Sequence, residues 1–377
     1  MSKKYQHLGI FSDWVAAAQQ EQKLWPAAEP GPETQRRFRQ VLGFTNRPDT
    51  PVDVKTEQRW ERDGLAGQVV SWSVGYGPRT RAWVLKPAGA THPLPGILAL
   101  HDHGDFKFYG KEKIAAGPDT PPQFLMDRFG KSYGGRAFAN ELAREGFVVV
   151  IHDVFLWGSR KFPLDAMAEN IRATAIAAKS NWWPNGNQPY DVAEYNAVAA
   201  LHEHTVEKYC NLLGTTLAGV VSFEDRVAFN YLLSRDDVLE DHCACIGLSG
   251  GGNRSAMLLA THDRVAAAVI VGLMSTYEGL LDHNMSHTWM LLPHGWSRFG
   301  DWPDVAACRA PLPLLVQYDL DDELFTVEGM RAAHQRIAER YAGAGHPEAY
   351  TGQFYPGPHK FGLQMQRAAF AWLAASI

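Results

Sequence analysis

Short apolar runs alternate with amphipathic stretches along most of the chain. The runs are rich in Val, Ile, Leu and Ala, and turn residues bound them. Continuous apolar runs of this length are typical of strands that are buried on both faces of a sheet. The predicted strands cover residues 68–73, 81–85, 96–101, 147–153, 243–248, 266–273, 313–318 and, more weakly, 349–355. Helical patterns lie between them, so the chain is predicted to be an α/β protein with a mostly parallel central sheet and helices on both faces.

Two segments depart from this alternation. Residues 1–60 show helical spacing of Ile10, Trp14 and Ala17, interrupted by five prolines, and are predicted to form a helical N-terminal arm. The arm carries no functional motif and is expected either to cover a sheet edge or to form a homo-oligomer contact. Residues 61–377 then form the α/β domain, in which 157–221 is predicted to be an inserted cap over the carboxyl ends of the strands.

The composition narrows the classes of partner and compartment. The net charge is −5 and no block of Lys or Arg occurs, so neither nucleic acid nor a membrane is an expected partner. No apolar segment reaches the roughly 18 residues of a membrane-spanning helix, and no signal-peptide pattern follows the N-terminus. The four cysteines lack disulfide or CxxC spacing and are interpreted as free: Cys210, Cys243, Cys245 and Cys308. Cys243 and Cys245 are also interpreted as buried strand residues. A cytoplasmic location is expected.

The strongest chemical signal is Gly-Leu-Ser-Gly-Gly-Gly at positions 247–252. It has the form G-x-S-x-G and lies between a predicted strand and a predicted helix. A serine on such a sharp turn adopts a strained backbone conformation and requires small residues two positions before and after it. Ser249 is therefore the predicted nucleophile, and the alternative is an idle serine in a glycine-rich helix entry.

A nucleophilic serine needs a base and an acid that orients the base, which follow it in the order acid, then histidine. His359 lies in a loop just before the last predicted helix and is the expected base. The acid should follow the strand at 313–318, where three aspartates compete. Asp322 is preferred because a short turn usually precedes the acid, and Asp319 and Asp321 remain open as alternatives.

The loop after the strand at 96–101 reads His-Asp-His-Gly-Asp at positions 101–105 and is the expected source of an oxyanion donor. The backbone N–H groups of His103 and Gly250 are predicted to form the oxyanion hole, although Asp102 stands where such loops usually have glycine. The residues His101, His103 and Asp105 also match the beginning of an HxHxDH metal-ligand motif. Phe106 replaces its final histidine, so a metal site is a minor alternative.

Several stretches together resemble a known family. Residues 141–160, ELAREGFVVVIHDVFLWGSR, are similar to the LA-x-x-GY-VV-x-x-D-x-x-x-x-G-x-R segment of α/β-hydrolases related to acetyl xylan esterases and dienelactone hydrolases. Residues 213–219 and the Glu-Asp-Arg that follows at 224–226 resemble the segment leading to the nucleophile strand. Asp322-Glu323-Leu324-Phe325 resembles the acid loop D-x-L-F-P, with Thr326 in place of proline. The resemblance runs from about Leu85 to the C-terminus.

The resemblance implies hydrolysis of a small-molecule carboxylic ester, such as an acetylated carbohydrate or an aryl ester, without a metal or an organic cofactor. Five aromatic residues of the cap region could line a substrate pocket or simply pack the cap: Phe155, Trp157, Trp182, Trp183 and Tyr190. Two other functions stay open. The same triad could cleave a carbon–carbon bond or an amide, or the chain could be a non-catalytic binding protein on a hydrolase scaffold.

Overall fold

The structure is a computed structural model that describes the chain except residues 1–3, 44–46, 179–187, 282, 284 and 286. Its described residues form one nine-stranded sheet in the order β1-β2-β3-β5-β4-β6-β7-β8-β9. The first three strands and β5 pair in antiparallel fashion, and every pair from β5 to β9 is parallel. The strands are β1 (Val52–Arg62), β2 (Leu65–Ser73), β3 (Thr80–Pro87), β4 (Leu94–Leu100), β5 (Val148–His152), β6 (Val238–Leu248), β7 (Ala267–Val271), β8 (Leu314–Asp319) and β9 (Tyr350–Tyr355).

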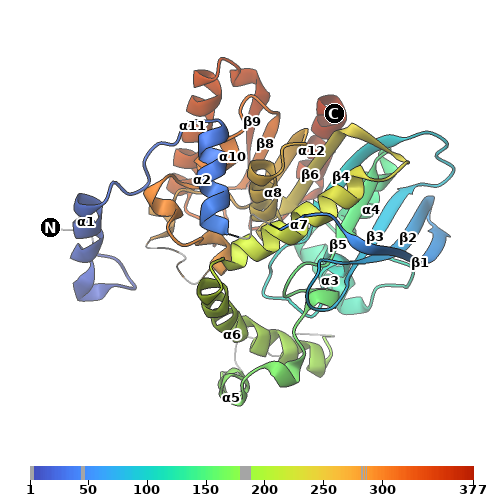
Figure 1. Ribbon diagram of the computed structural model, residues 1–377, viewed down its shortest axis with the longest axis horizontal. Helices are drawn as coiled ribbons and strands as arrows, with labels where there is room; N and C mark the ends of the chain where they lie inside the picture. Colours follow the sequence, from blue (N-terminus) through green and yellow to red (C-terminus); the bar gives the residue numbers. More distant parts are fainter. Residues whose placement is uncertain (1–3, 44–46, 179–187, 282, 284, 286) are drawn as a thin grey trace.

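Helices cover both faces of this sheet (Figure 1). Along β4, Leu98 and Leu100 belong to one hydrophobic core and Ile97 and Ala99 to another, as expected for a strand buried on both sides. The helices that contribute to the first core are α2 (Pro32–Leu42), α7 (Leu217–Leu233), α8 (Gly250–Thr261), α10 (Trp302–Ala307) and α11 (Val327–Gly343). Those that contribute to the second core are α3 (Gln123–Ser132), α4 (Phe138–Arg144) and α12 (Leu363–Ser376). The predicted α/β class with helices on both faces is confirmed.

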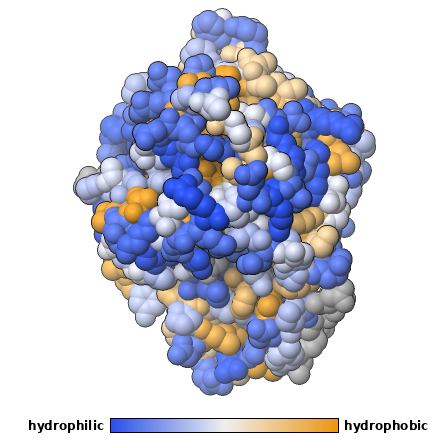
Figure 2. All heavy atoms as spheres, turned by 90° about the vertical axis from the view of Figure 1, so that its right-hand side faces the viewer, coloured by the Kyte–Doolittle hydropathy of each residue, from blue (hydrophilic) through white to orange (hydrophobic). Residues whose placement is uncertain are grey.

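The predicted helical arm is wrong over its last residues, because β1 begins at Val52. Every residue of β1 is exposed or half-buried, so the strand lacks the buried alternation that identifies strands in a sequence. Charged side chains line it, as is usual for an edge strand that must not pair with another molecule. Figure 2, which faces this side of the molecule, shows a mostly hydrophilic surface with scattered apolar groups.

The remainder of the arm contains two helices with different surroundings. α1 (Asp13–Glu21) has no buried residue, and Trp14 on it is 67% exposed. α2 is part of the fold instead, because Phe38 and Leu42 are each 1% exposed. The ring of Phe38 makes edge contacts with those of Trp296 at 5.0 Å and Trp302 at 6.1 Å between centroids. Of the arm, α2 thus belongs to the hydrophobic core.

The predicted insertion connects β5 to α7. It contains two 3-10 turns, η3 (Gly158–Arg160) and η4 (Leu164–Ala166), and the helices α5 (Glu169–Ala177) and α6 (Tyr190–Leu212). The two helices pack together beside the body of the sheet (Figure 1). The remaining helix is the short α9 (Tyr277–Leu280), after β7.

The four cysteines are free, and Cys243 and Cys245 are buried strand residues, as interpreted from the sequence; Cys210 and Cys308 are buried as well. Within the described part of the chain, no helix combines the length and the hydropathy needed to cross a membrane.

The docking of α2 yields a stability prediction. Phe38→Ala removes a fully buried ring between two tryptophans, so the free energy of unfolding should fall by about 3–5 kcal/mol. Urea unfolding followed by circular dichroism measures this change. Leu212→Ala, at a site that is 84% exposed at the end of α6, is the control and should change stability by less than about 0.5 kcal/mol. Equal stability of Phe38→Ala and wild type would contradict the assignment of α2 to the core.

Candidate active site

Ser249 lies at the sharp turn between β6 and α8 with φ 58° and ψ −123°. A non-glycine residue with positive φ is strained, and such strain persists where the surroundings hold it. Two bonds hold this one: the Ser249 N–H donates to the carbonyl of Val271 at 2.8 Å, and its carbonyl accepts the N–H of Asn253 at 2.9 Å. The side chain is 6% exposed, so the hydroxyl sits at a narrow opening of the surface.

The glycines around Ser249 are required by close approach of the backbone. A Cβ atom on Gly247 would lie 2.4 Å from the carbonyl carbon of Gly251, one turn into α8. A Cβ atom on Gly250 would lie 2.6 Å from the backbone nitrogen of His103. Side chains at either position would push the helix away from the strand or from the loop after β4. A Cβ atom on Gly251, the second glycine of G-x-S-x-G, would lie 2.1 Å from the carbonyl oxygen of Leu100, so geometry requires both glycines of the pattern.

His359 and Asp322 form a close pair. The Nδ1 of His359 lies 2.6 Å from Oδ2 of Asp322, whose other oxygen accepts the Leu324 N–H at 2.8 Å. The other two aspartates bind backbone instead: Asp319 accepts the N–H of Lys360 at 3.3 Å, and Asp321 accepts that of Gly357 at 2.7 Å. The structure therefore places Asp322, the preferred candidate, on the imidazole.

The environment of these groups agrees with their placement. Burial alone would lower the pKa of His359, but the hydrogen bond and charge of Asp322, together with Asp319, raise it above its ordinary value. Burial raises the pKa of Asp319 to about 7, so this carboxyl is in part neutral near pH 7. A carboxyl that is in part neutral stabilises an imidazolium less well, so Asp319 is the weaker candidate for the orienting acid.

His359 and Ser249 meet at the end of β7. A Cβ atom on Gly272 would lie 3.2 Å from Cε1 of His359, and the preceding residue, Val271, accepts the Ser249 N–H. Among the described residues, the Ser249 hydroxyl has no hydrogen-bond partner. Catalytic hydrogen bonds are often long without substrate and tighten in the reactive complex.

The loop after β4 brings His103 against the nucleophile turn, as the 2.6 Å approach to Gly250 shows. Neither the N–H of His103 nor that of Gly250, the first residue of α8, has an acceptor among the described residues. Two N–H groups from different elements, each without an acceptor among the described residues, thus lie near Ser249, and an oxyanion requires donors of this kind.

Sequence reasoning missed the cationic groups that hold this loop. The carbonyl of His101 accepts a bond from Arg254 of α8 at 3.1 Å. Asp102 is buried and binds Arg128 and Tyr133 through its carboxylate. Burial would raise the pKa of Asp102, but the charges of Arg128 and Lys113 lower it, so the carboxylate stays ionised. No local motif marks these residues, since their partners lie up to 153 positions away.

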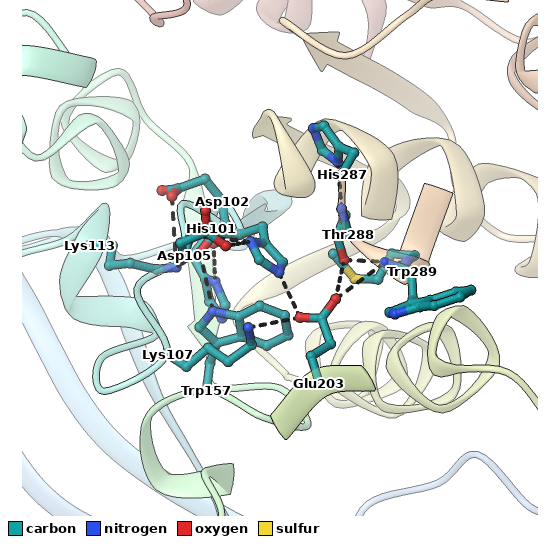
Figure 3. Close-up of polar contacts among 12 residues, drawn as sticks. His101, Asp102, Asp105, Lys107, Lys113, Trp157, Glu203, His287, Thr288 and Trp289 are labelled. Carbon is teal, nitrogen blue, oxygen red and sulfur yellow. Dashed lines mark hydrogen bonds and ion pairs between the residues drawn. The ribbon is translucent and has the colours of Figure 1, made fainter. Parts of the chain in front are cut away.

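Glu203 of α6 binds the same loop from the other side (Figure 3). Its Oε2 lies 2.8 Å from Nε2 of His103 and 2.8 Å from Nζ of Lys107. Its Oε1 accepts bonds from the hydroxyl of Thr288 at 3.0 Å and the N–H of Trp289 at 3.2 Å. The carboxylate is buried. It belongs to the insertion and binds residues of both the loop after β4 and the loop after β7. The insertion therefore contacts the carboxyl ends of the strands, where the predicted cap was expected.

The five aromatic residues predicted for a pocket have different surroundings. Trp157 is 1% exposed and lies behind the loop, where its indole N–H donates to the His103 carbonyl at 3.3 Å. Phe155 is half-buried against the core, and Tyr190 is 53% exposed at the start of α6. Trp182 and Trp183 lie outside the described residues.

A cluster of half-buried rings that the sequence reasoning did not select follows the loop directly. Phe106 and Tyr109 stack at 5.9 Å, and Phe124 lies 6.4 Å from Phe106. The spacing Asp-Phe-Lys-Phe-Tyr after the loop is the signal that could have identified them. His287, in the segment after β7, is also half-buried, and burial lowers its pKa to about 4.

The metal alternative is not supported by the placement of its residues. The His103 imidazole is occupied by Glu203 at Nε2 and accepts the Asp105 N–H at Nδ1. Among the described residues, the group of three or more ligand-type side chains with atoms within 4.8 Å consists of Asp319, Asp322 and His359. The HxHxD residues do not form such a group.

The architecture matches solved structures over most of its length. A "putative acetyl xylan esterase" from Bacteroides fragilis NCTC 9343 superposes with a TM-score of 0.64, covering 86% of this chain and 73% of that one at 16% identity. The glucuronoyl esterase from Solibacter usitatus gives a TM-score of 0.62, covering 92% and 91% at 14% identity. The chain has the α/β-hydrolase fold. In this fold a sharp turn between a strand and a helix lies at the top of the sheet, and Ser249 is on such a turn between β6 and α8.

A protein that is similar to this chain in sequence was also found. "Putative hydrolase YtaP" from Bacillus subtilis (strain 168) is 23% identical over 329 residues, which are 84% of this chain and 90% of that protein. No known protein family's profile matches the chain. The likeness to an α/β-hydrolase that was inferred from motifs thus agrees with both comparisons.

The His359–Asp322 pair predicts a titration effect. In Asp322→Asn the pKa of His359 should fall, because the charge that raises it is removed while burial, which lowers it, remains. An NMR titration of the His359 imidazole measures the change. Asp321→Asn is the matched control, since Asp321 lies one residue away, is exposed and binds only the Gly357 N–H among the described residues. An equal fall in both variants would contradict the pairing.

Proposed function

We propose that this protein hydrolyses a carboxylic ester of a small molecule through an acyl-enzyme on Ser249. The observation that carries the proposal is that five residues from four separate segments lie at one edge of the sheet. These are the strained Ser249, the His359–Asp322 pair and the two N–H groups of His103 and Gly250. The similar solved structures are named as esterases, which supports an ester as the substrate class.

The proposed cycle uses each group once or twice. His359 accepts the Ser249 hydroxyl proton as the oxygen attacks the ester carbonyl, and Asp322 holds the imidazole with Nδ1–H directed at itself. The N–H groups of His103 and Gly250 stabilise the oxyanion of the tetrahedral intermediate. His359 then protonates the leaving alcohol, and a water activated by the same imidazole releases the acid from Ser249.

The substrate is proposed to carry an aryl or sugar group. The half-buried rings of Phe106, Tyr109 and Phe124 begin three residues after His103, close to where the ester would bind. Aromatic rings of this kind stack on flat aryl groups and on the apolar faces of sugars. The predicted contributions of Phe155, Trp182, Trp183 and Tyr190 remain proposals, as does the separate role of residues 157–221 as a cap.

Fluorophosphonate labelling tests the nucleophile. The wild-type protein should gain one adduct by intact-mass analysis, and Ser249→Ala should gain none, because the probe reacts only with an activated serine. Ser255→Ala, a buried serine on the next turn of α8, is the control and should label like wild type. Failure of folded wild type to label would favour a non-catalytic binding protein.

The reaction class and the base are tested by steady-state kinetics. Aryl acetates and acetylated sugars should be turned over, whereas a β-diketone and an anilide should not; turnover of the diketone alone would make the protein a carbon–carbon hydrolase.

In Asp322→Asn, kcat should fall by roughly 10⁴-fold because the imidazole tautomer is no longer fixed. The acid limb of kcat/KM should also move to lower pH, since His359 must be neutral to act and its pKa falls.

A further inference from the structure

Lys113 is the fully buried lysine of the loop after β4, with 0% exposure at the end of the short turn η2 (Lys111–Lys113). Burial lowers the pKa of Lys113 to about 7, and the amino group can donate hydrogen bonds in either protonation state. Its Nζ donates to the carbonyl oxygen of Asp102 and, at 3.1 Å, to that of His103 (Figure 3). The Asp102 carboxylate is farther away, at 3.7 Å, and already binds Arg128 and Tyr133. The main partners of this amino group are therefore two backbone carbonyls.

The first of these carbonyls belongs to the peptide unit that supplies the oxyanion donor. The peptide between Asp102 and His103 is trans, because the one cis bond among the described residues precedes Pro311. In a trans peptide the C=O and the N–H point in opposite directions. A donor that fixes the Asp102 oxygen on one side of the plane thus directs the His103 N–H to the other side, where Gly250 lies.

The rest of His103 is fixed as well. Its carbonyl accepts bonds from Lys113 and from the indole N–H of Trp157, and its imidazole binds Glu203. The backbone N–H is the polar group of this residue that has no partner among the described residues. If the Asp102–His103 peptide turned over, the Asp102 oxygen would face the developing oxyanion, and two like partial charges would oppose each other.

We propose that Lys113 is a positioning residue for the oxyanion hole, where its terminal amino group donates to the Asp102–His103 peptide and keeps the N–H directed at the reacting oxygen. This role rests on the proposed function, because it requires an oxyanion beside Ser249. Lys113 does not touch the substrate. It acts through the orientation of one peptide plane.

The test compares Lys113→Met with wild type in ester hydrolysis and in binding of an aryl trifluoromethyl ketone. The ketone forms a hemiketal on the serine, whose oxyanion occupies the oxyanion hole. Lys113→Met keeps the apolar stem and removes the donor, so kcat should fall by about 100-fold, as for loss of one oxyanion donor, with KM within about twofold. The inhibition constant of the ketone should rise by the same factor as kcat/KM falls.

The ketone separates positioning from a structural role. A variant with a smaller folded fraction would lose active sites in a burst titration and would keep the affinity of the remaining ones. Lys111→Met is the matched control: Lys111 lies on the same turn, is also buried and pairs with Asp153 at 2.8 Å without touching the loop carbonyls. The folded fraction of Lys111→Met should bind the ketone with the affinity of wild type.

Three results would decide against the proposal. Lys113→Met with kcat and ketone affinity within about threefold of wild type would overturn it, and so would an equal loss of affinity in Lys111→Met. If Lys113→Met does not fold, Lys113→Leu replaces it, since leucine also lacks a donor and has a different apolar shape; unchanged ketone affinity in that variant would also overturn the role. A wild-type protein that neither hydrolyses esters nor binds the ketone would instead overturn the proposed function itself.

Discussion

The left-handed backbone of Ser249 is the constraint on which the rest of the site depends. This conformation turns the chain sharply from β6 into α8 and leaves the side chain at the carboxyl edge of the sheet. The hydrogen bond from its N–H to Val271 ties the turn to β7, and Gly247 and Gly251 touch because no side chain separates them. A turn of this kind is strained by itself, so it persists only because the adjacent strands and the helix hold it.

The same turn fixes where the other loops must lie. β4 and β6 are neighbours in the sheet, with Leu100 opposite Gly247, so the loop after β4 begins beside the nucleophile. β7 and β8 are the next strands in the sheet, and the loops after them contain Gly272 and Asp322, respectively. Parallel strands end at one edge, and this alone brings together residues that are far apart in the sequence.

The oxyanion loop is held by charges rather than by regular structure. Arg254 binds the carbonyl of His101, Lys113 those of Asp102 and His103, and Glu203 the imidazole of His103. Buried charges are costly unless they are paired and hydrogen-bonded, and here each one has a partner on the loop. The insertion supplies Glu203, so residues added between β5 and α7 take part in shaping the loop after β4.

The sequence by itself determined the parts that follow from local pattern. Apolar runs marked the parallel strands, G-x-S-x-G marked Ser249, and chain order marked Asp322 and His359, because these features are written in neighbouring residues or in a fixed order along the fold. Only the tertiary structure decided that β1 is an exposed strand, that Trp157 is buried behind the loop, and that Lys113 and Glu203 meet His103. An edge strand with two polar faces has no periodic signal, and a buried ion pair depends on distances across the fold that no local pattern records.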